Sequence, residues 1–188
     1  MSAEAPVLER CDTGTAGLDH ISGGGFPAQA LYLLQGNPGV GKTTLVMQFL
    51  LAGSRKSESC LYVTFSQTRQ KLFTVARLHG WSLDGLNILE LSSLAQQLTA
   101  EAANTLFDPD TVIILRHFEA RASVRQSILV TKKRSGENER TIRDFKGTER
   151  GLWVGEPLLH FRGVVTGVPV LESRPGSTKD KESGDPGN

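Results

Sequence analysis

The chain has few of the residues that build disulfide frameworks and metal sites. Its 188 residues include two cysteines and four histidines, and neither Cys11 nor Cys60 belongs to a Cys-x-x-Cys pair. This composition excludes a disulfide-stabilised extracellular domain and gives no zinc-ligand spacing. We therefore expect a protein of the reducing cytoplasm.

An excess of charge of one sign and long hydrophobic runs are also missing. Lys and Arg number 21 against 20 Asp and Glu, a formal net charge of +1, which excludes a uniformly basic nucleic-acid coat and a polyanionic tail. No segment approaches the roughly 20 apolar residues of a membrane span, and the N-terminus lacks the apolar stretch of a signal peptide. With 38% hydrophobic residues the chain is expected to form one core and to have no contact with a membrane.

Glycine is plentiful and clustered. There are 20 glycines, and two clusters flank the apolar run 30–34, which predicts a buried strand. The first cluster, 23–25, follows a stretch, 13–19, that we interpret as rich in turns. The second cluster, 36–41, precedes residues 42–51, whose helix formers and apolar spacing predict a helix that ends near Gly53.

Strands and helices are expected to alternate over the next fifty residues. Strands are predicted at 60–65 and 87–91, and helices at 68–79 and from Ser92 or Ser93 onward, an order typical of a parallel sheet. The runs 111–119 and 124–131 are separated by four residues and predict an antiparallel hairpin at the sheet edge. We expect an N-terminal extension at 1–12, one domain at 13–171 and a disordered tail at 172–188.

One motif carries the chemistry. Residues 36–43 read GNPGVGKT and match the phosphate-loop pattern G-x-x-x-x-G-K-[ST] between a strand and a helix. In such a loop the glycines turn backbone N–H groups toward phosphate oxygens, the lysine reaches the β and γ phosphates, and the hydroxyl binds Mg²⁺. The alternative is a glycine-rich turn with a solvated lysine. The predicted nucleotide-binding residues are Gly36, Asn37, Pro38, Gly39, Val40, Gly41, Lys42, Thr43 and Thr44, with Thr43 as metal ligand.

Together with residues 13–19 (TGTAGLD) and 23–27 (GGGFP), the loop resembles a RecA-superfamily ATPase of the KaiC type. Residues 110–116, 130–134 and 142–145 resemble the C-terminal half of the same domain. The resemblance implies an α/β fold: a RecA-like P-loop NTPase with a mostly parallel sheet and a C-terminal antiparallel hairpin. It also implies ATP and Mg²⁺ as ligands, and homo-oligomeric rings, commonly hexamers, in a family that includes circadian clock proteins.

In such rings a Lys and an Arg two residues apart reach the neighbouring subunit's γ-phosphate, and Lys132 and Arg134 match that pair. Residues 116–150 hold ten Lys and Arg against five Asp and Glu. An arginine supplied in trans stabilises developing charge on a phosphoryl group. Two alternatives remain open: a charged edge that prevents aggregation, and a basic hairpin that binds nucleic acid.

The catalytic residues depart from the family pattern. Gln67 stands where KaiC-type domains carry glutamate; it can orient a water but cannot accept its proton, and an ordinary loop residue is nearly as good an interpretation. The apolar run 112–115 ends in Arg116 instead of the Walker B aspartate, and Asp108 and Asp110 precede a strand instead of following one. We expect ATP binding with slow or absent hydrolysis.

Between Phe107 and Asp110 the resemblance passes directly from the early third of the KaiC domain to its late third, which indicates an internal truncation. The omitted part supplies the strands that flank the phosphate-loop strand, so either 60–65 or 111–115 would have to take their place, or the chain would not fold stably. The Ser-Thr pair that the clock protein phosphorylates is replaced by Leu106 and Phe107, so no such self-phosphorylation is expected. A non-enzymatic assembly or nucleic-acid-binding module is the alternative function.

Overall fold

The structure is a computed structural model that describes residues 9–64, 66–90, 109–120, 122–133, 139–164 and 170–171. It contains three helices in these ranges, α1 (Ala16–Ile21), α2 (Lys42–Arg55) and α3 (Arg69–Leu78). The strands described are β1 (Arg10–Cys11), β2 (Phe26–Pro27), β3 (Tyr32–Gly36), β4 (Cys60–Thr64), β5 (Leu86–Glu90), β6 (Thr111–Ala120), β7 (Ser123–Lys133), β8 (Arg143–Thr148), β9 (Gly151–Pro157), β10 (Phe161–Arg162) and β11 (Val170–Leu171). None of the three described helices meets the length and hydropathy that a membrane crossing requires.

Five strands form the main sheet, in the order β3-β6-β7-β8-β9. The phosphate-loop strand β3 is the edge strand of this sheet among the described residues, and its partner β6 runs parallel to it with Tyr32 opposite Thr111 and Gly36 opposite Leu115. Of the two substitutes considered for the missing strands, the segment 111–115 is therefore the one that pairs with the phosphate-loop strand. Strand β4 instead pairs in parallel with β5 in a separate two-stranded sheet.

The mixed α/β class is confirmed, and two details of the expected sheet are corrected. The β3–β6 and β4–β5 pairs are parallel, but β6, β7, β8 and β9 are joined by antiparallel pairings, so the main sheet is not mostly parallel. The hairpin β6–β7 lies inside the sheet instead of at its edge, because β8 and β9 continue the sheet beyond it.

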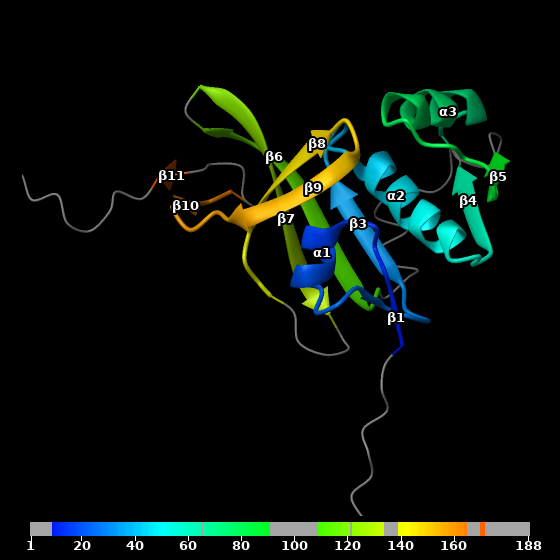
Figure 1. The fold of residues 1–188 in the computed structure, drawn as a ribbon. Coiled ribbons are helices and arrows are strands. Elements are labelled where there is room, and N and C mark those ends of the chain that lie inside the picture. The colour runs from blue at the N-terminus through cyan, green and yellow to red at the C-terminus, as the bar shows by residue number, and fades with distance from the viewer. Residues whose placement is uncertain are drawn as a thin grey trace, which may run out of the picture.

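Helix α2 lies between the two sheets (Figure 1). Its Leu45 belongs to the core that the five-stranded sheet forms with α1, whereas Met47 and Leu51 belong to a second core under α3, β4 and β5. Burial of two apolar sides fits the even spread of apolar residues along this helix. The phosphate-loop helix therefore joins both halves of the described structure.

Helices α2 and α3 agree with the sequence, and α1 does not. Thr68 accepts a hydrogen bond from the Lys71 amide as the predicted N-cap of α3, and α2 continues two residues past Gly53. The stretch interpreted as rich in turns contains α1, whose Leu18 and Ile21 are buried in the main core. The predicted helix after Ser92 lies outside the described residues.

A glutamine connects α2 to segments at both ends of the chain. The Nε2 group of Gln48 donates to the Gly14 carbonyl at 2.6 Å, and its Oε1 accepts from the Leu152 amide at 2.9 Å. The contact with β9 is tight, because a Cβ on Gly151 would lie 2.6 Å from Gln48 Oε1. Gln48 thus fastens the N-terminal segment and β9 to the same face of α2.

Candidate functional site

The phosphate loop connects β3 directly to α2. Asn37, Pro38 and Gly39 are exposed, whereas Val40 is fully buried and packs in the main core. One side chain therefore anchors the loop, while its tip, 37–39, faces solvent. Such an arrangement leaves the backbone amides open to a ligand while the core fixes their position.

The three loop glycines are required for two different reasons. Gly39 and Gly41 have φ values of 77° and 97°, which L side chains rarely adopt. Gly36 instead lies against β6, because a Cβ there would be 2.6 Å from the Leu115 carbonyl oxygen. Gly36 is thus required for close packing on β6, in addition to the approach of phosphate expected from the sequence.

The N-terminus of α2 has features of an anion site. Its N-cap is Gly41, no side chain caps its first amides, and its first turn contains no acidic residue. The unpaired N–H groups and the positive end of the helix dipole therefore face the loop without a neutralising carboxylate from the helix itself. Helix N-termini of this kind favour phosphate oxygens.

Lys42 is already held in the loop. Its Nζ donates to the carbonyl oxygens of Gly36 at 2.7 Å and Asn37 at 2.9 Å. An ammonium group has three donors, so one hydrogen remains for a phosphate oxygen. The two backbone contacts place the charge inside the loop before any ligand arrives.

Gln67, predicted to orient a water, lies against Thr43. Its Nε2 donates to Thr43 Oγ1 at 3.0 Å, and its Oε1 accepts from the Tyr62 hydroxyl at 3.4 Å. Burial raises the pKa of Tyr62, so this hydroxyl keeps its proton and stays a donor at neutral pH. The chain Tyr62–Gln67–Thr43 thus connects β4 to the first turn of α2.

The donor set does not fit a complete magnesium site. Thr43 offers one hydroxyl oxygen, and a Gln67 N–H already points at it. No group of three or more His, Cys, Asp or Glu suited to a metal occurs in the part of the chain that the structure describes. Asp110 binds the Leu31 amide through Oδ2 at the end of the β3–β6 pair remote from the loop, and Asp108 lies outside the described residues.

Sequence reasoning missed one residue at the loop. Arg116 directly follows Leu115, which pairs with Gly36, so the middle of β6 lies beside the start of the loop. Its Nη1 donates to Asn37 Oδ1 at 3.1 Å. The parallel register between β3 and β6 brings these residues together, and no local pattern in the sequence could have shown that register.

The proposed trans pair is only partly described. Lys132 pairs with Val112 on β6, three residues from Leu115 and toward the far end of the β3–β6 pair. At about 3.3 Å per residue, its backbone lies roughly 10 Å along the strands from the loop end. Arg134 lies outside the described residues.

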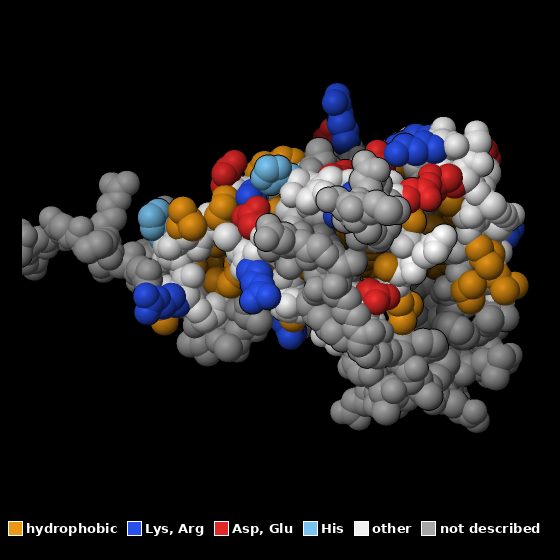
Figure 2. Space-filling model, turned by 90° about the horizontal axis from the view of Figure 1, so that it is seen from below, with side chains coloured by type: hydrophobic (Ala, Val, Ile, Leu, Met, Phe, Trp, Pro, Cys, Tyr) orange, Lys and Arg blue, Asp and Glu red, His pale blue; other side chains and the backbone are white. Residues whose placement is uncertain are grey.

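Among the described residues of the basic stretch 116–150, two arginines are paired with carboxylates. Arg125 pairs with Asp144 at 3.0 Å and Arg143 with Glu139 at 2.8 Å. On the face shown in Figure 2, Lys and Arg side chains are interspersed with acidic and apolar ones. Nothing in this distribution favours the nucleic-acid alternative.

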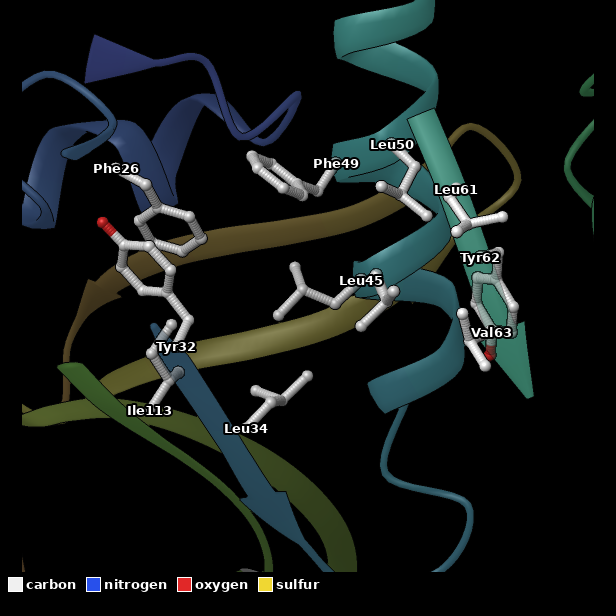
Figure 3. A pocket seen from close by; sticks show the side chains of 11 residues that line it. Phe26, Tyr32, Leu34, Leu45, Phe49, Leu50, Leu61, Tyr62, Val63 and Ile113 are labelled. Atoms are coloured by element: carbon white, nitrogen blue, oxygen red, sulfur yellow. The ribbon is translucent and has the colours of Figure 1, made fainter. Parts of the chain in front are cut away.

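An apolar groove of about 500 Å³ lies where flanking strands were expected, between β3, α2 and β4 (Figure 3). Tyr32 and Leu34 line it from β3, and Leu45 and Phe49 from α2. Across the groove, Leu61 and Val63 of β4 remain 56% and 41% exposed. The groove therefore marks the space between the two sheets, away from the polar contacts of Lys42.

Comparison with known proteins identifies the family. The KaiC ATPase family model matches residues 11–105, which include the whole phosphate loop. The chain belongs to the KaiC ATPase family. The KaiC family match ends before β6, so it covers β3, α2, β4, α3 and β5 of the structure but neither Arg116 nor the trans pair.

Individual relatives are similar to this chain over different shares of its length. The chain is 23% identical to the circadian clock protein KaiC3 of Synechocystis over 88% of this chain and 47% of that protein. It is 22% identical to the circadian clock oscillator protein KaiC of Thermostichus vulcanus over 86% of this chain and 45% of that protein. The DNA repair protein RadA of Escherichia coli is 36% identical over 47% of this chain and 19% of its own length. The chain thus spans about half the length of these two KaiC proteins.

The alignment lengths support an internal truncation of the KaiC domain. The alignment with KaiC3 has 240 positions, which exceed the 188 residues of this chain by 52. At least that many positions of the relative therefore have no counterpart here. Their absence fits the edge position of β3 and the groove beside it.

Proposed function

We propose that this chain is a nucleotide-binding domain that holds the phosphates of ATP in the loop 36–43 and hydrolyses ATP slowly or not at all. The observation that carries the proposal is the position of Lys42, which is fixed by two loop carbonyls at the uncapped start of α2. Phosphate affinity in such a loop resides in local amides and one ammonium group. These local groups are the part of the KaiC domain that the truncation leaves intact.

Slow hydrolysis follows from the groups beside Thr43. Gln67 can orient a water molecule, but its amide cannot take the proton that attack on the γ-phosphate releases. Mg²⁺ bound through Thr43 remains a prediction, supported by the family and opposed by the Gln67 contact. We therefore expect ATP turnover near the uncatalysed background.

The assembly is proposed from the family and from the position of Lys132. Since Lys132 lies toward the far end of the β3–β6 pair, Lys132 and Arg134 would contact a nucleotide of a neighbouring subunit. A cytoplasmic homo-oligomeric ring, with residues 13–171 as the nucleotide-binding domain, is the corresponding proposal.

Equilibrium dialysis with labelled ATP tests the binding proposal. We expect Lys42→Ala to abolish measurable ATP uptake, because a point charge at the β and γ phosphates is lost, while Lys71→Ala binds like the wild type. Lys71 is the matched control because it is an exposed lysine of α3, outside the phosphate loop. A folded wild type that takes up no ATP, or a Lys42→Ala variant with unchanged uptake, would overturn the proposal.

A further inference from the structure

Two cations from different elements converge on one residue of the phosphate loop. Lys42 Nζ contacts the carbonyl oxygen of Asn37 at 2.9 Å, and Arg116 Nη1 contacts its side-chain oxygen at 3.1 Å. Lys42 comes from the first turn of α2 and Arg116 from the middle of β6. The loop is thus flanked by positive charge on two sides.

Neither cation forms an ion pair with a carboxylate among the described residues. The ion pairs found within the described ranges are Lys56–Asp12, Arg125–Asp144 and Arg143–Glu139, and none involves Lys42 or Arg116. The Nε atom of Arg116 is buried and has no hydrogen-bond partner among the described residues. A buried donor without an acceptor is unfavourable, so this guanidinium group is suited to an incoming anion.

The described residues offer few ligands for the Mg²⁺ that usually neutralises a bound triphosphate. A Gln67 N–H points at the Thr43 oxygen that a cation would need, and the described residues offer no cluster of acidic ligands. A guanidinium group is always charged and presents planar paired donors that match phosphate oxygens. Arg116 therefore supplies positive charge to a phosphate loop whose metal site is incomplete.

We infer that Arg116 is a phosphate-binding residue of its own subunit, which together with Lys42 neutralises the terminal phosphates of ATP and makes binding largely independent of Mg²⁺. This inference rests on the proposed function, because it assigns a second cation to the same nucleotide site. It differs from the trans pair, since Arg116 serves the loop of its own chain.

Titration calorimetry with ATP, in Mg²⁺ and in EDTA, tests the assignment. We expect the wild type to bind ATP with affinities within about threefold of each other in the two buffers. Arg116→Gln should lower the affinity in EDTA about 10- to 100-fold, because a charge-assisted hydrogen bond is lost. Lys42→Ala should lose binding in both buffers. Arg55→Gln, at the exposed far end of α2, is the matched control and should not change the affinity.

Asn37→Ala distinguishes phosphate binding from a purely structural clamp. This change removes the protein partner of Arg116 but keeps its charge, so we expect a smaller loss of affinity than in Arg116→Gln. Thermal unfolding of the ligand-free variants checks that each one is folded.

Three results would overturn the assignment while leaving ATP binding itself intact. These are wild-type binding that disappears in EDTA, an Arg116→Gln variant with unchanged affinity, and an equal loss in Asn37→Ala and Arg116→Gln. Absence of ATP binding to the folded wild type in both buffers would refute the proposed function, and the role of Arg116 with it.

Discussion

Gln48 offers a sharp test of how the structure is held together. Its amide joins the Gly14 carbonyl and the Leu152 amide to α2. Gln48→Ala removes two hydrogen bonds and leaves a partly buried carbonyl and N–H without their partner. Each net hydrogen bond contributes about 1 kcal/mol, and each orphaned buried group costs about 1–3 kcal/mol. Allowing for partial access of water, we expect a loss of about 2–4 kcal/mol in the free energy of unfolding.

Urea unfolding measures this loss, and thermal unfolding should show a decrease in Tm of about 5–15 °C for a chain of this size. Gln70→Ala is the matched control, because Gln70 is exposed on α3 and the same substitution slightly favours the helix. If Gln48→Ala is as stable as Gln70→Ala within about 0.5 kcal/mol, the connection from α2 to β9 contributes nothing and the reasoning fails.

Three further predictions concern the loop, the metal and acid stability. Gly36→Ala should destabilise the fold by about 1–3 kcal/mol in urea unfolding, since the added methyl group meets the Leu115 carbonyl; unchanged stability would contradict the packing argument. Gln67→Glu should make ATP binding more dependent on Mg²⁺ in calorimetry, because a carboxylate attracts the cation; equal affinities in Mg²⁺ and EDTA would count against this. Hydrogen bonds from Arg143 hold the pKa of Glu139 below its usual value. The Glu139 carboxylate therefore stabilises the fold above about pH 4.5, and this stabilisation is lost as the pH falls through the lowered pKa. A Glu139→Gln variant whose stability depends on pH as in the wild type would refute this role of Glu139.

Local features of the fold and the site could be predicted from the sequence. The strand–loop–helix unit around Lys42 and the capped helix α3 depend on residues close together in the chain, and both occur as predicted. Gln67 and Thr43 each follow a strand that leads into a helix, so their proximity could be expected from the sequence. The particular hydrogen bond between them could not.

Long-range pairings could not be predicted with the same success. The choice of β6 as the partner of β3 depends on competition among strands that the sequence leaves undecided, and Arg116 enters the site only through that pairing. Strands β8 and β9 were missed as strands, although the apolar run Leu152 to Val154 between turn residues was a usable signal. Their presence turns an expected edge hairpin into the middle of the sheet.

Because β3 pairs with β6, the hydrogen-bonded sheet extends beyond residue 105, where the match to the family model ends. A polypeptide cut at residue 105 would keep every residue of the ATP-binding motif and the entire matched region, yet β3 would lose its described hydrogen-bonded neighbour and α2 its anchor on β9. We expect such a fragment to bind nucleotide poorly, since the contacts that hold its loop amides in position would be lost. Domain boundaries for expression should therefore follow the hydrogen-bonded sheet, which extends to Pro157 in β9, and not the limits of homology.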